Sequence, residues 1–203
     1  MLFQFDEQFY SDGVGLLCGV DEAGRGPLAG PVVAAAVVLG PGTRLSGIKD
    51  SKELTPKKRE GLYDIIVARA TAWQVGIVDH DAIDRINILR ASLAAMEESV
   101  RGLGVTCDLV LVDGRYGLGG AIPCRAIVRG DQQSAHIAAA SIIAKVTRDR
   151  IMQGFHAYYP HYNFFRNKGY GTPEHLRALR RYGPCPIHRK TFSGVRGMIN
   201  ETR

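Results

Sequence analysis

The chain has 203 residues, a formal net charge of +6 at pH 7 and 45% hydrophobic residues, an ordinary balance for a globular protein. This composition excludes a disordered chain, a collagen and a coiled coil. No apolar stretch reaches the ~20 residues of a membrane helix, and no signal peptide is visible. The four cysteines never form Cys-x-x-Cys, which argues against a zinc site. We therefore expect a soluble, cytoplasmic protein with a single domain over residues 1–203. Its basic charge permits a polyanionic partner without requiring one.

Apolar runs and turn residues predict the order of strands and helices. The first half is expected to contain strands over 16–20 and 31–39, a helix over 55–70 that begins at Thr55-Pro56, a strand over 73–78 and a helix over 81–103 with a break near Asn87. The second half is expected to contain strands over 109–112 and 126–128, a long helix over 134–155, a helix from Thr172-Pro173 to Gly183, and a short helix after Ser193. Strands in hairpins followed by strands alternating with helices predict an α/β fold, with a mixed sheet and helices on both faces.

A glycine-rich turn over residues 24–30 joins the first two predicted strands. A dinucleotide-binding fingerprint requires a helix after the glycines, but a β-branched strand pattern follows here, and no P-loop sequence is present. Glycines at such a place let the backbone approach another group closely. An ordinary hairpin turn is the alternative interpretation.

Carboxylates follow the ends of predicted strands. Asp21 and Glu22 close the first strand, Asp113 closes 109–112, and Asp131 precedes the long helix. If they converge, they repel one another and need a cation, and an all-oxygen set suits Mg²⁺ or Mn²⁺, two of which support phosphodiester cleavage. Asp113 could instead belong to a turn, and Asp131 could be a favourable charge ahead of a helix. Asp21 and Glu22 can serve one site only if the strand ends or twists there.

Basic and hydroxyl side chains form another candidate group. Ser141, Lys145 and Arg148 share one face of the long predicted helix. This face could line a path for phosphates, although a solvated polar stripe is the commoner explanation. Lys52 lies in a polar loop and fits a surface charge equally well.

Two further segments carry residues that could contact a ligand. Tyr170 is flanked by Gly169 and Gly171, and an exposed aromatic ring in such a loop suits a sugar or a base. A tyrosine packed in the core is the alternative. We interpret His188-Arg189-Lys190 as a basic surface patch rather than as the place of a catalytic base.

Taken together, these motifs resemble those of the bacterial ribonuclease HII family, the type 2 ribonucleases H. They span about residues 16 to 192, in the order and spacing of the family. The motifs are Gly19-Val-Asp21-Glu22-Ala-Gly24-Arg25-Gly26-Pro27, Asp50-Ser51-Lys52, Leu111-Val-Asp113-Gly114, Gly130-Asp131, Ala139-Ala-Ser141-Ile-Ile-Ala-Lys145-Val and Lys168-Gly-Tyr170-Gly-Thr172.

The resemblance implies a ribonuclease H-like fold, with a helical C-terminal part over about 170–203 that contributes to substrate binding. It implies an endoribonuclease that hydrolyses the RNA strand of RNA–DNA hybrids. Such an enzyme also incises 5′ of single ribonucleotides embedded in duplex DNA, and leaves 3′-OH and 5′-phosphate ends. The implied cofactors are two Mg²⁺ or Mn²⁺ ions, and the implied state is a monomer without an obligate protein partner.

Residue by residue, Asp21, Glu22, Asp113 and Asp131 match the catalytic acids that hold the ions. Gly24-Arg25-Gly26 matches the loop that senses the ribose 2′-OH, and Tyr170 matches the tyrosine that stacks beside the DNA–RNA junction. Lys52, Ser141 and Lys145 match positions that contact backbone phosphates. The chain departs from the family at Asn167, where histidine is frequent.

Two alternatives to this enzyme remain. A module that binds RNA–DNA hybrid without cutting it has no need for four acids beside phosphates. Another nuclease of the same broad fold, such as a resolvase or a type 1 ribonuclease H, is disfavoured by the Gly24-Arg25-Gly26 loop and by Tyr170. The same loop argues against the related ribonuclease HIII type.

Overall fold

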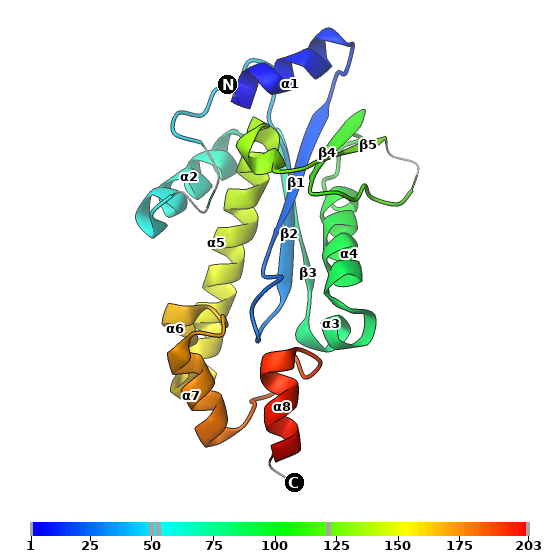
Figure 1. Ribbon diagram of the computed structural model, residues 1–203. Helices are drawn as coiled ribbons and strands as arrows, with labels where there is room; N and C mark the ends of the chain where they lie inside the picture. The colour runs from blue at the N-terminus through cyan, green and yellow to red at the C-terminus, as the bar shows by residue number, and fades with distance from the viewer. Residues whose placement is uncertain (1, 49–50, 52–53, 121–122, 202–203) are drawn as a thin grey trace.

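The computed structural model describes residues 2–48, 51, 54–120 and 123–201. Lys52 lies outside the described residues, so its predicted contact with phosphate has no structural counterpart here. The chain builds a five-stranded mixed sheet, with helices on both faces and a group of helices at one end (Figure 1). This architecture confirms the predicted α/β class.

The sheet has the strand order β3-β2-β1-β4-β5. β1 is antiparallel to β2, which is antiparallel to β3, whereas β4 is parallel to β1 and β5 is parallel to β4. The bounds are β1 Leu17–Ala23, β2 Val32–Val38, β3 Ala72–Val78, β4 Leu109–Asp113 and β5 Cys124–Ile127. Each matches a strand predicted from an apolar run to within about three residues at either end, and the pattern of a hairpin followed by crossovers produces the mixed sheet.

Local sequence signals explain where several helices begin and end. Thr55 and Thr172 each cap a helix whose first residue is a proline, as predicted. Asn87 has a φ of 67°, and its side-chain oxygen accepts the N–H groups of Leu89 and Arg90, which separates α3 from α4 at the predicted break. The helices are α1 Leu2–Ser11, α2 Pro56–Arg69, α3 His80–Ile86, α4 Ile88–Arg101, α5 Ala135–Tyr158, α6 Phe164–Asn167, α7 Pro173–Tyr182 and α8 Ser193–Glu201, with 3-10 turns η2 Gly130–Gln132 and η3 Pro160–Tyr162.

Both faces of the sheet are covered, which explains why β2 is apolar throughout. Its residues are all buried, and they alternate between two cores, one against α2 and α5 and the other against α4. Gly19 in β1 lies directly against the start of α5, where an added Cβ would be 2.2 Å from the His136 carbonyl carbon. The small-residue face of α5, Ala138 to Ala140, is fully buried as well. The helix therefore packs against the sheet almost backbone to backbone.

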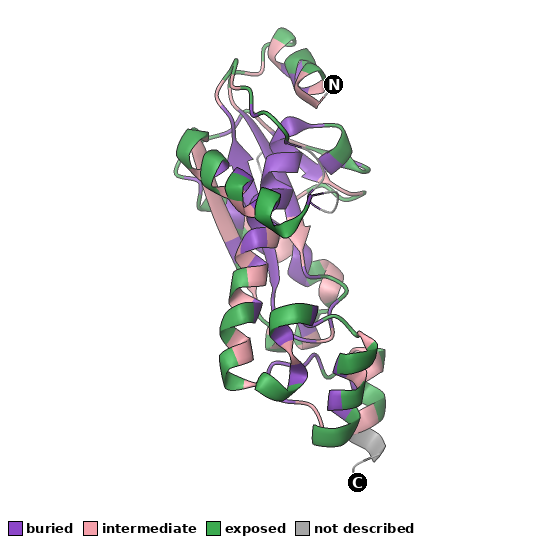
Figure 2. Cartoon of the chain, turned by 90° about the vertical axis from the view of Figure 1, so that its left-hand side faces the viewer, coloured by how far each residue is buried: buried purple, intermediate pink, exposed green. Residues whose placement is uncertain are grey.

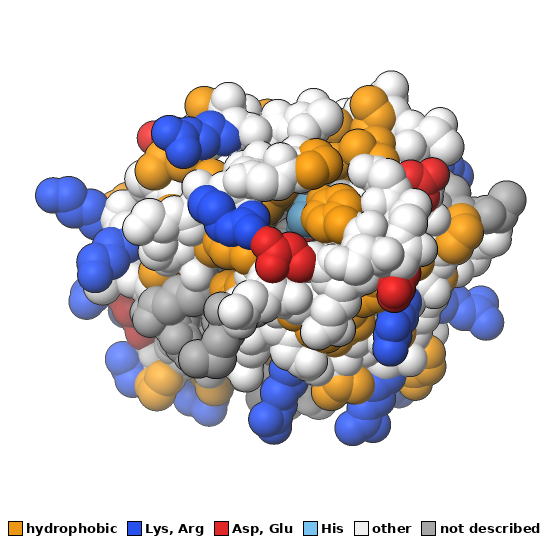
Figure 3. Space-filling model, turned by 90° about the horizontal axis from the view of Figure 1, so that it is seen from above, with side chains coloured by type: hydrophobic (Ala, Val, Ile, Leu, Met, Phe, Trp, Pro, Cys, Tyr) orange, Lys and Arg blue, Asp and Glu red, His pale blue; other side chains and the backbone are white. Residues whose placement is uncertain are grey.

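The first helix, α1, was not predicted from the sequence. Its Asp6 side chain is buried and accepts the N–H groups of Ala135 and His136, so it caps the start of α5. This end of the molecule is shown in Figure 3, where Lys and Arg side chains surround the outline, in keeping with the net positive charge.

No helix in the described ranges is long and apolar enough to cross a membrane.

Helices α6, α7 and α8 gather at the end of the sheet away from α1 (Figure 1). Their small core includes Phe164, Leu179 and Ile187, and it also receives Leu28 and Ala29 from the β1–β2 connection. Buried residues concentrate in the sheet, while these helices show much exposed surface (Figure 2). The C-terminal helices thus pack around the glycine-rich turn.

Candidate active site

Three of the predicted acids come together where β1 and β4 end. These strands are parallel and pair Val20 with Val112, so Asp21 and Asp113 follow side by side. Burial, together with the charges of Glu22 and Asp113, raises the pKa of Asp21 well above its ordinary value. Burial also raises the pKa of Glu22, where the Arg25 charge opposes it and the Asp113 charge adds to it. Asp21 and Glu22 therefore share one charged site despite being adjacent in β1.

Asp131 lies in the 3-10 turn η2, which connects β5 to α5. The N–H group of Gly130 donates to Oδ1 of Asp113 over 2.7 Å, which ties this turn to the end of β4. The Asp131 side chain is buried. Asp131 therefore directly follows the residue that is hydrogen-bonded to Asp113.

The donor chemistry of these acids fits a hard divalent cation. Oε2 of Glu22 is buried and has no hydrogen-bond partner among the described residues, which leaves an acceptor for a cation or a water. Asp21, Glu22 and Asp113 offer carboxylate oxygens, the kind of ligand atom that Mg²⁺ and Mn²⁺ prefer. Within the part of the chain that the structure describes, no three His, Cys, Asp or Glu side chains are already arranged to hold a metal ion. The fit is therefore one of chemistry, and binding would require small movements of the carboxylates.

Ser141 and Lys145 lie beside this site on α5. Ser141 lies close enough to Asp21 to oppose the rise in its pKa. The Ser141 hydroxyl is almost completely buried and lies 2.8 Å from the Ser51 hydroxyl. Lys145 pairs with Asp149 over 2.6 Å. Because Ser141 and Arg148 are buried, a solvated polar stripe does not explain this face of the helix.

The glycine-rich turn is held in a tightly constrained conformation. Gly24 has a φ of 102°, and an added Cβ would lie 2.2 Å from Nε of Arg148. Arg25 is exposed and its Nη1 contacts Oε1 of Glu22 over 3.2 Å. Gly26 faces the Tyr170 ring, whose Cε1 would be 3.7 Å from a Cβ there. The turn therefore connects the acids to Tyr170.

Two arginines with fully buried guanidinium groups hold this turn from behind. Arg148 donates to the carbonyl oxygens of Ala29, Pro31 and Lys168 over 3.0 to 3.1 Å. Arg189 donates to those of Gly24, Arg25 and Gly30 over 2.6 to 3.0 Å. Burial lowers the pKa of Arg148 to about 10 and that of Arg189 to about 9, so both remain charged at neutral pH.

The interpretation of His188-Arg189-Lys190 as a surface patch is wrong for its first two residues, which have no exposed area. Arg189 binds backbone carbonyls more than 150 residues away, and His188 binds the Cys185 N–H and the His175 ring, so the basic character of this segment gives no sign of their burial. Ile187 to Arg189 pairs with the glycine-rich turn through hydrogen bonds from Arg189 N–H to Leu28 and from Gly30 N–H to Ile187. Sequence reasoning missed this element.

Tyr170 is 43% exposed, which excludes the packed-core alternative. The Lys145 ammonium and the Arg148 guanidinium each lie 5.9 Å from the centre of its ring. Asn167, at the position where the family often has histidine, donates to the Tyr162 carbonyl and accepts the Gly169 N–H. Asn167 thus shapes the turn that presents Tyr170.

Two buried histidines, His175 and His188, link the Tyr170 backbone to Cys185 through hydrogen bonds. The Cys185 N–H donates to Nδ1 of His188, Nε2 of His188 lies 2.9 Å from Nε2 of His175, and Nδ1 of His175 lies 2.9 Å from the Tyr170 carbonyl oxygen. Only one proton arrangement satisfies all three contacts: His188 protonated at Nε2 and His175 at Nδ1, both neutral. Burial lowers the pKa of His175, and burial with the nearby His175 lowers that of His188 to about 4.

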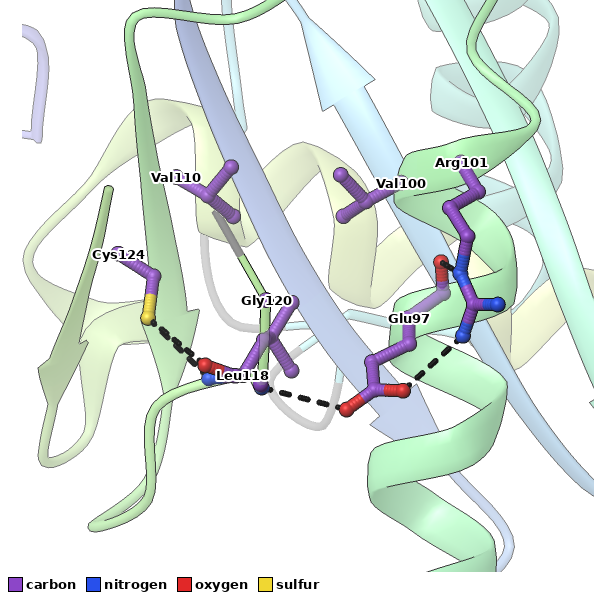
Figure 4. Close-up of a pocket in the computed structure, with 8 residues that line it drawn as sticks. Glu97, Val100, Arg101, Val110, Leu118, Gly120 and Cys124 are labelled. Atoms are coloured by element: carbon purple, nitrogen blue, oxygen red, sulfur yellow. Dashed lines mark hydrogen bonds and ion pairs between the residues drawn. The ribbon is translucent and has the colours of Figure 1, made fainter. Parts of the chain in front are cut away.

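A cavity of about 460 Å³ lies elsewhere, between α4 and the segment that leads into β5 (Figure 4). It is lined by Val100, Val110, Leu118 and Cys124, with Glu97 and Arg101 paired at its edge. None of the predicted site residues lines it. Two of the acids, Glu22 and Asp113, border a small hollow of about 20 Å³ together with Arg25.

Comparison with known proteins agrees with this arrangement. A family model described as Ribonuclease HII matches residues 18–195. A ribonuclease HII from Geotalea daltonii is 54% identical over 195 residues, which cover 96% of this chain and 90% of that protein. The crystal structure of the ribonuclease H2 from Pyrococcus horikoshii has a TM-score of 0.78 and 28% identity, covering 92% of this chain and 98% of that chain.

The fold extends to more distant proteins. Bst-RNase HIII, solved in complex with Mn²⁺, has a TM-score of 0.69 at 15% identity, and the match covers 93% of this chain and 70% of that one. That likeness concerns the fold alone, whereas the family match and the Geotalea relative extend over nearly the whole sequence. This chain therefore belongs to the ribonuclease HII family, the endoribonucleases that act on RNA–DNA hybrids.

Proposed function

We propose that this endoribonuclease, besides cutting the RNA strand of hybrids, incises 5′ of single ribonucleotides embedded in duplex DNA and leaves 3′-OH and 5′-phosphate ends. The observation that carries the proposal is the contact chain from Asp113 and Glu22 through Arg25 and Gly26 to Tyr170. It joins a site for phosphate chemistry to a backbone turn and an open aromatic ring. Such a combination can read one sugar and cut beside it.

In this proposal Asp21, Glu22, Asp113 and Asp131 hold two divalent ions. When bound, Mg²⁺ or Mn²⁺ activates the attacking water and neutralises charge at the scissile phosphate. The Mn²⁺ complex of the similarly folded Bst-RNase HIII supports this assignment. Oε2 of Glu22, which has no hydrogen-bond partner among the described residues, and the raised pKa values of Asp21 and Glu22 support this assignment from within the chain. Buried, mutually repelling carboxylates favour a cation between them.

The surrounding residues keep the acids in place. The Glu22 N–H donates to Asp21, and Ser141 lies close enough to Asp21 to lower its pKa. Arg25 pairs with Glu22, and the Gly130 N–H donates to Asp113. We therefore assign Ser141 to the orientation of Asp21 within the substrate site.

The remaining polar groups are assigned to the substrate. The turn Gly24-Arg25-Gly26 senses the ribose 2′-OH, which distinguishes RNA from DNA. Tyr170 stacks beside the junction, and Lys145, whose charge lies near that ring, attracts backbone phosphates together with Lys52. The C-terminal part, about 170–203, contributes to binding, and the enzyme works in the cytoplasm as a monomer on nucleic acid alone.

The test uses a DNA duplex that contains one ribonucleotide, beside an all-DNA duplex of the same sequence. Each is incubated with Mg²⁺, with Mn²⁺ or with chelator. We expect incision 5′ of the ribonucleotide only with metal, and an intact all-DNA duplex. Asp64→Asn, on the exposed face of α2, is the control for loss of a carboxylate and should cut at the wild-type rate. Metal-dependent cutting of long hybrids without incision at the single ribonucleotide would refute the proposal.

A further inference from the structure

Arg189 occupies an unusual environment for a charged side chain. It has no exposed area, and its three nitrogen positions all donate to backbone carbonyls, those of Gly24, Arg25 and Gly30. No carboxylate forms an ion pair with it anywhere in the described ranges. The Asp84 carboxylate is near enough to favour the charge on Arg189, but burying an arginine without an ion pair is still costly. The position therefore calls for an explanation beyond packing.

The explanation lies in the two peptide groups that Arg189 binds. A trans peptide is planar, and its N–H points away from its C=O. Nη2 of Arg189 holds the Gly24 carbonyl and Nη1 holds the Arg25 carbonyl, so both oxygens point toward the same buried guanidinium. The N–H groups of Arg25 and Gly26 must then point the opposite way. Both residues are exposed, and no hydrogen bond between described residues uses either N–H.

We propose that Arg189 is a positioning residue for ribonucleotide recognition, because it holds the Gly24 and Arg25 carbonyls inward and thereby aims the N–H groups of Arg25 and Gly26 at the ribose 2′ oxygen. This inference rests on the proposed role of the turn as the 2′-OH sensor. The charge on Arg189 also polarises both peptides, which strengthens their outward N–H groups as donors. Recognition of the sugar would thus depend on a residue more than 160 positions away in the chain.

Arg148 provides a matched control. Its guanidinium is equally buried and also donates to three carbonyls, but these belong to Ala29, Pro31 and Lys168 rather than to the Gly24 and Arg25 peptides. Arg148→Lys and Arg189→Lys should therefore lower the thermal midpoint of unfolding to a similar extent. Only Arg189→Lys removes the two guanidinium nitrogens that bind the Gly24 and Arg25 carbonyls.

The experiment compares kcat/KM on a duplex with one ribonucleotide and on the same duplex with a 2′-fluoro nucleotide, which keeps the size of the 2′ group but accepts hydrogen bonds poorly. We expect the preference for 2′-OH over 2′-fluoro to fall about tenfold in Arg189→Lys, the equivalent of one hydrogen bond. Arg148→Lys leaves the Gly24 and Arg25 carbonyls on Arg189, so we expect its preference to fall less than that of Arg189→Lys.

The possible outcomes separate the two ideas. An unchanged preference in a folded Arg189→Lys overturns this inference and leaves the sensing turn intact. A wild-type enzyme without any preference for 2′-OH overturns the proposed sensing and this inference with it.

If Arg189→Lys does not fold, the inference can be tested by NMR on the wild-type protein, through the amide proton resonances of Arg25 and Gly26. In chelator, both amide protons should shift downfield when the ribonucleotide duplex is added and not when the all-DNA duplex is added. Equal shifts with both duplexes overturn the inference.

Discussion

Acidification should destabilise the protein through the buried pair His175 and His188. The pKa of His188 determines how much unfolding free energy is lost. Its only proton arrangement in the folded state is the neutral one, since Nδ1 accepts the Cys185 N–H and Nε2 faces His175. Burial and His175 lower its pKa from the ordinary 6.5 to about 4. In the unfolded chain the ring takes up a proton near pH 6.5. Between about pH 6.5 and 4 the unfolded state thus binds more protons, and stability is lost as the pH falls.

The size of this loss follows from the two pKa values. A difference of about 2.5 pH units corresponds to about 3 kcal/mol of unfolding free energy, of which about 2 kcal/mol is lost between pH 7 and pH 5. Below pH 4 His188 should contribute no further loss. Asp21 and Glu22, whose pKa values are raised, act in the opposite direction, because protonation then favours the folded state. The contribution of His188 must therefore be isolated by comparison.

Urea unfolding can be followed by the fluorescence of Trp73, the single tryptophan, at pH 7, 6 and 5 in chelator. We expect the wild type to lose about 2 kcal/mol more than His188→Gln across this range, because glutamine does not titrate. His161→Gln, which removes an exposed histidine, controls for the general effect of losing an imidazole. If wild type and His188→Gln show the same pH dependence, His188 takes up its proton inside the fold and our assignment of the hydrogen-bond chain is wrong.

Four substitutions test other parts of the structure. Gly19→Ala should lower the unfolding free energy by about 3 kcal/mol, because the new Cβ would meet the His136 backbone at 2.2 Å. Gly154→Ala, in α5 with open space around its Cα, should raise it by about 1 kcal/mol, and denaturant unfolding of both variants checks the contrast. Asp113→Asn should abolish metal-dependent turnover in a cleavage assay while hybrid binding, measured by fluorescence anisotropy, persists; cleavage at the wild-type rate would contradict its role. Tyr170→Ala should reduce junction cleavage more than tenfold with a small change in thermal midpoint, since the side chain is 43% exposed; a large drop in midpoint instead would mean that the ring is structural.

The fold could be predicted from sequence where burial leaves a local pattern. The run over 31–39 is apolar because β2 is covered on both faces, and the capping residues Thr55 and Thr172 mark their helices directly. Helix α1 had no comparable signal. Its place depends on Asp6 reaching the start of α5, 129 residues away, and such a contact is invisible in a local window.

The candidate site divides in the same way. Strand direction alone suggested that Asp21 and Asp113 would meet, and they do, although their roles in metal binding remain predictions. The burial of His188 and Arg189 could not be predicted, because basic residues are normally exposed. Arg189 is satisfied by backbone carbonyls of a distant turn, and His188 by the Cys185 N–H and the His175 ring. The family resemblance named the turn and Tyr170 but did not indicate what holds them.

Helix α5 has a consequence for where the strand would be cut. It runs for 24 residues, about 36 Å, without interruption. In the proposed mechanism Ser141 on this helix orients Asp21. Arg148, two turns or about 10 Å further along, anchors the segments that carry Gly26 and Tyr170. In that mechanism the helix fixes the distance between the cleavage site and the residues that recognise the sugar. An enzyme built this way would place its nick at a constant distance from the ribonucleotide, and a single-residue insertion between positions 141 and 148 would put the two activities out of phase.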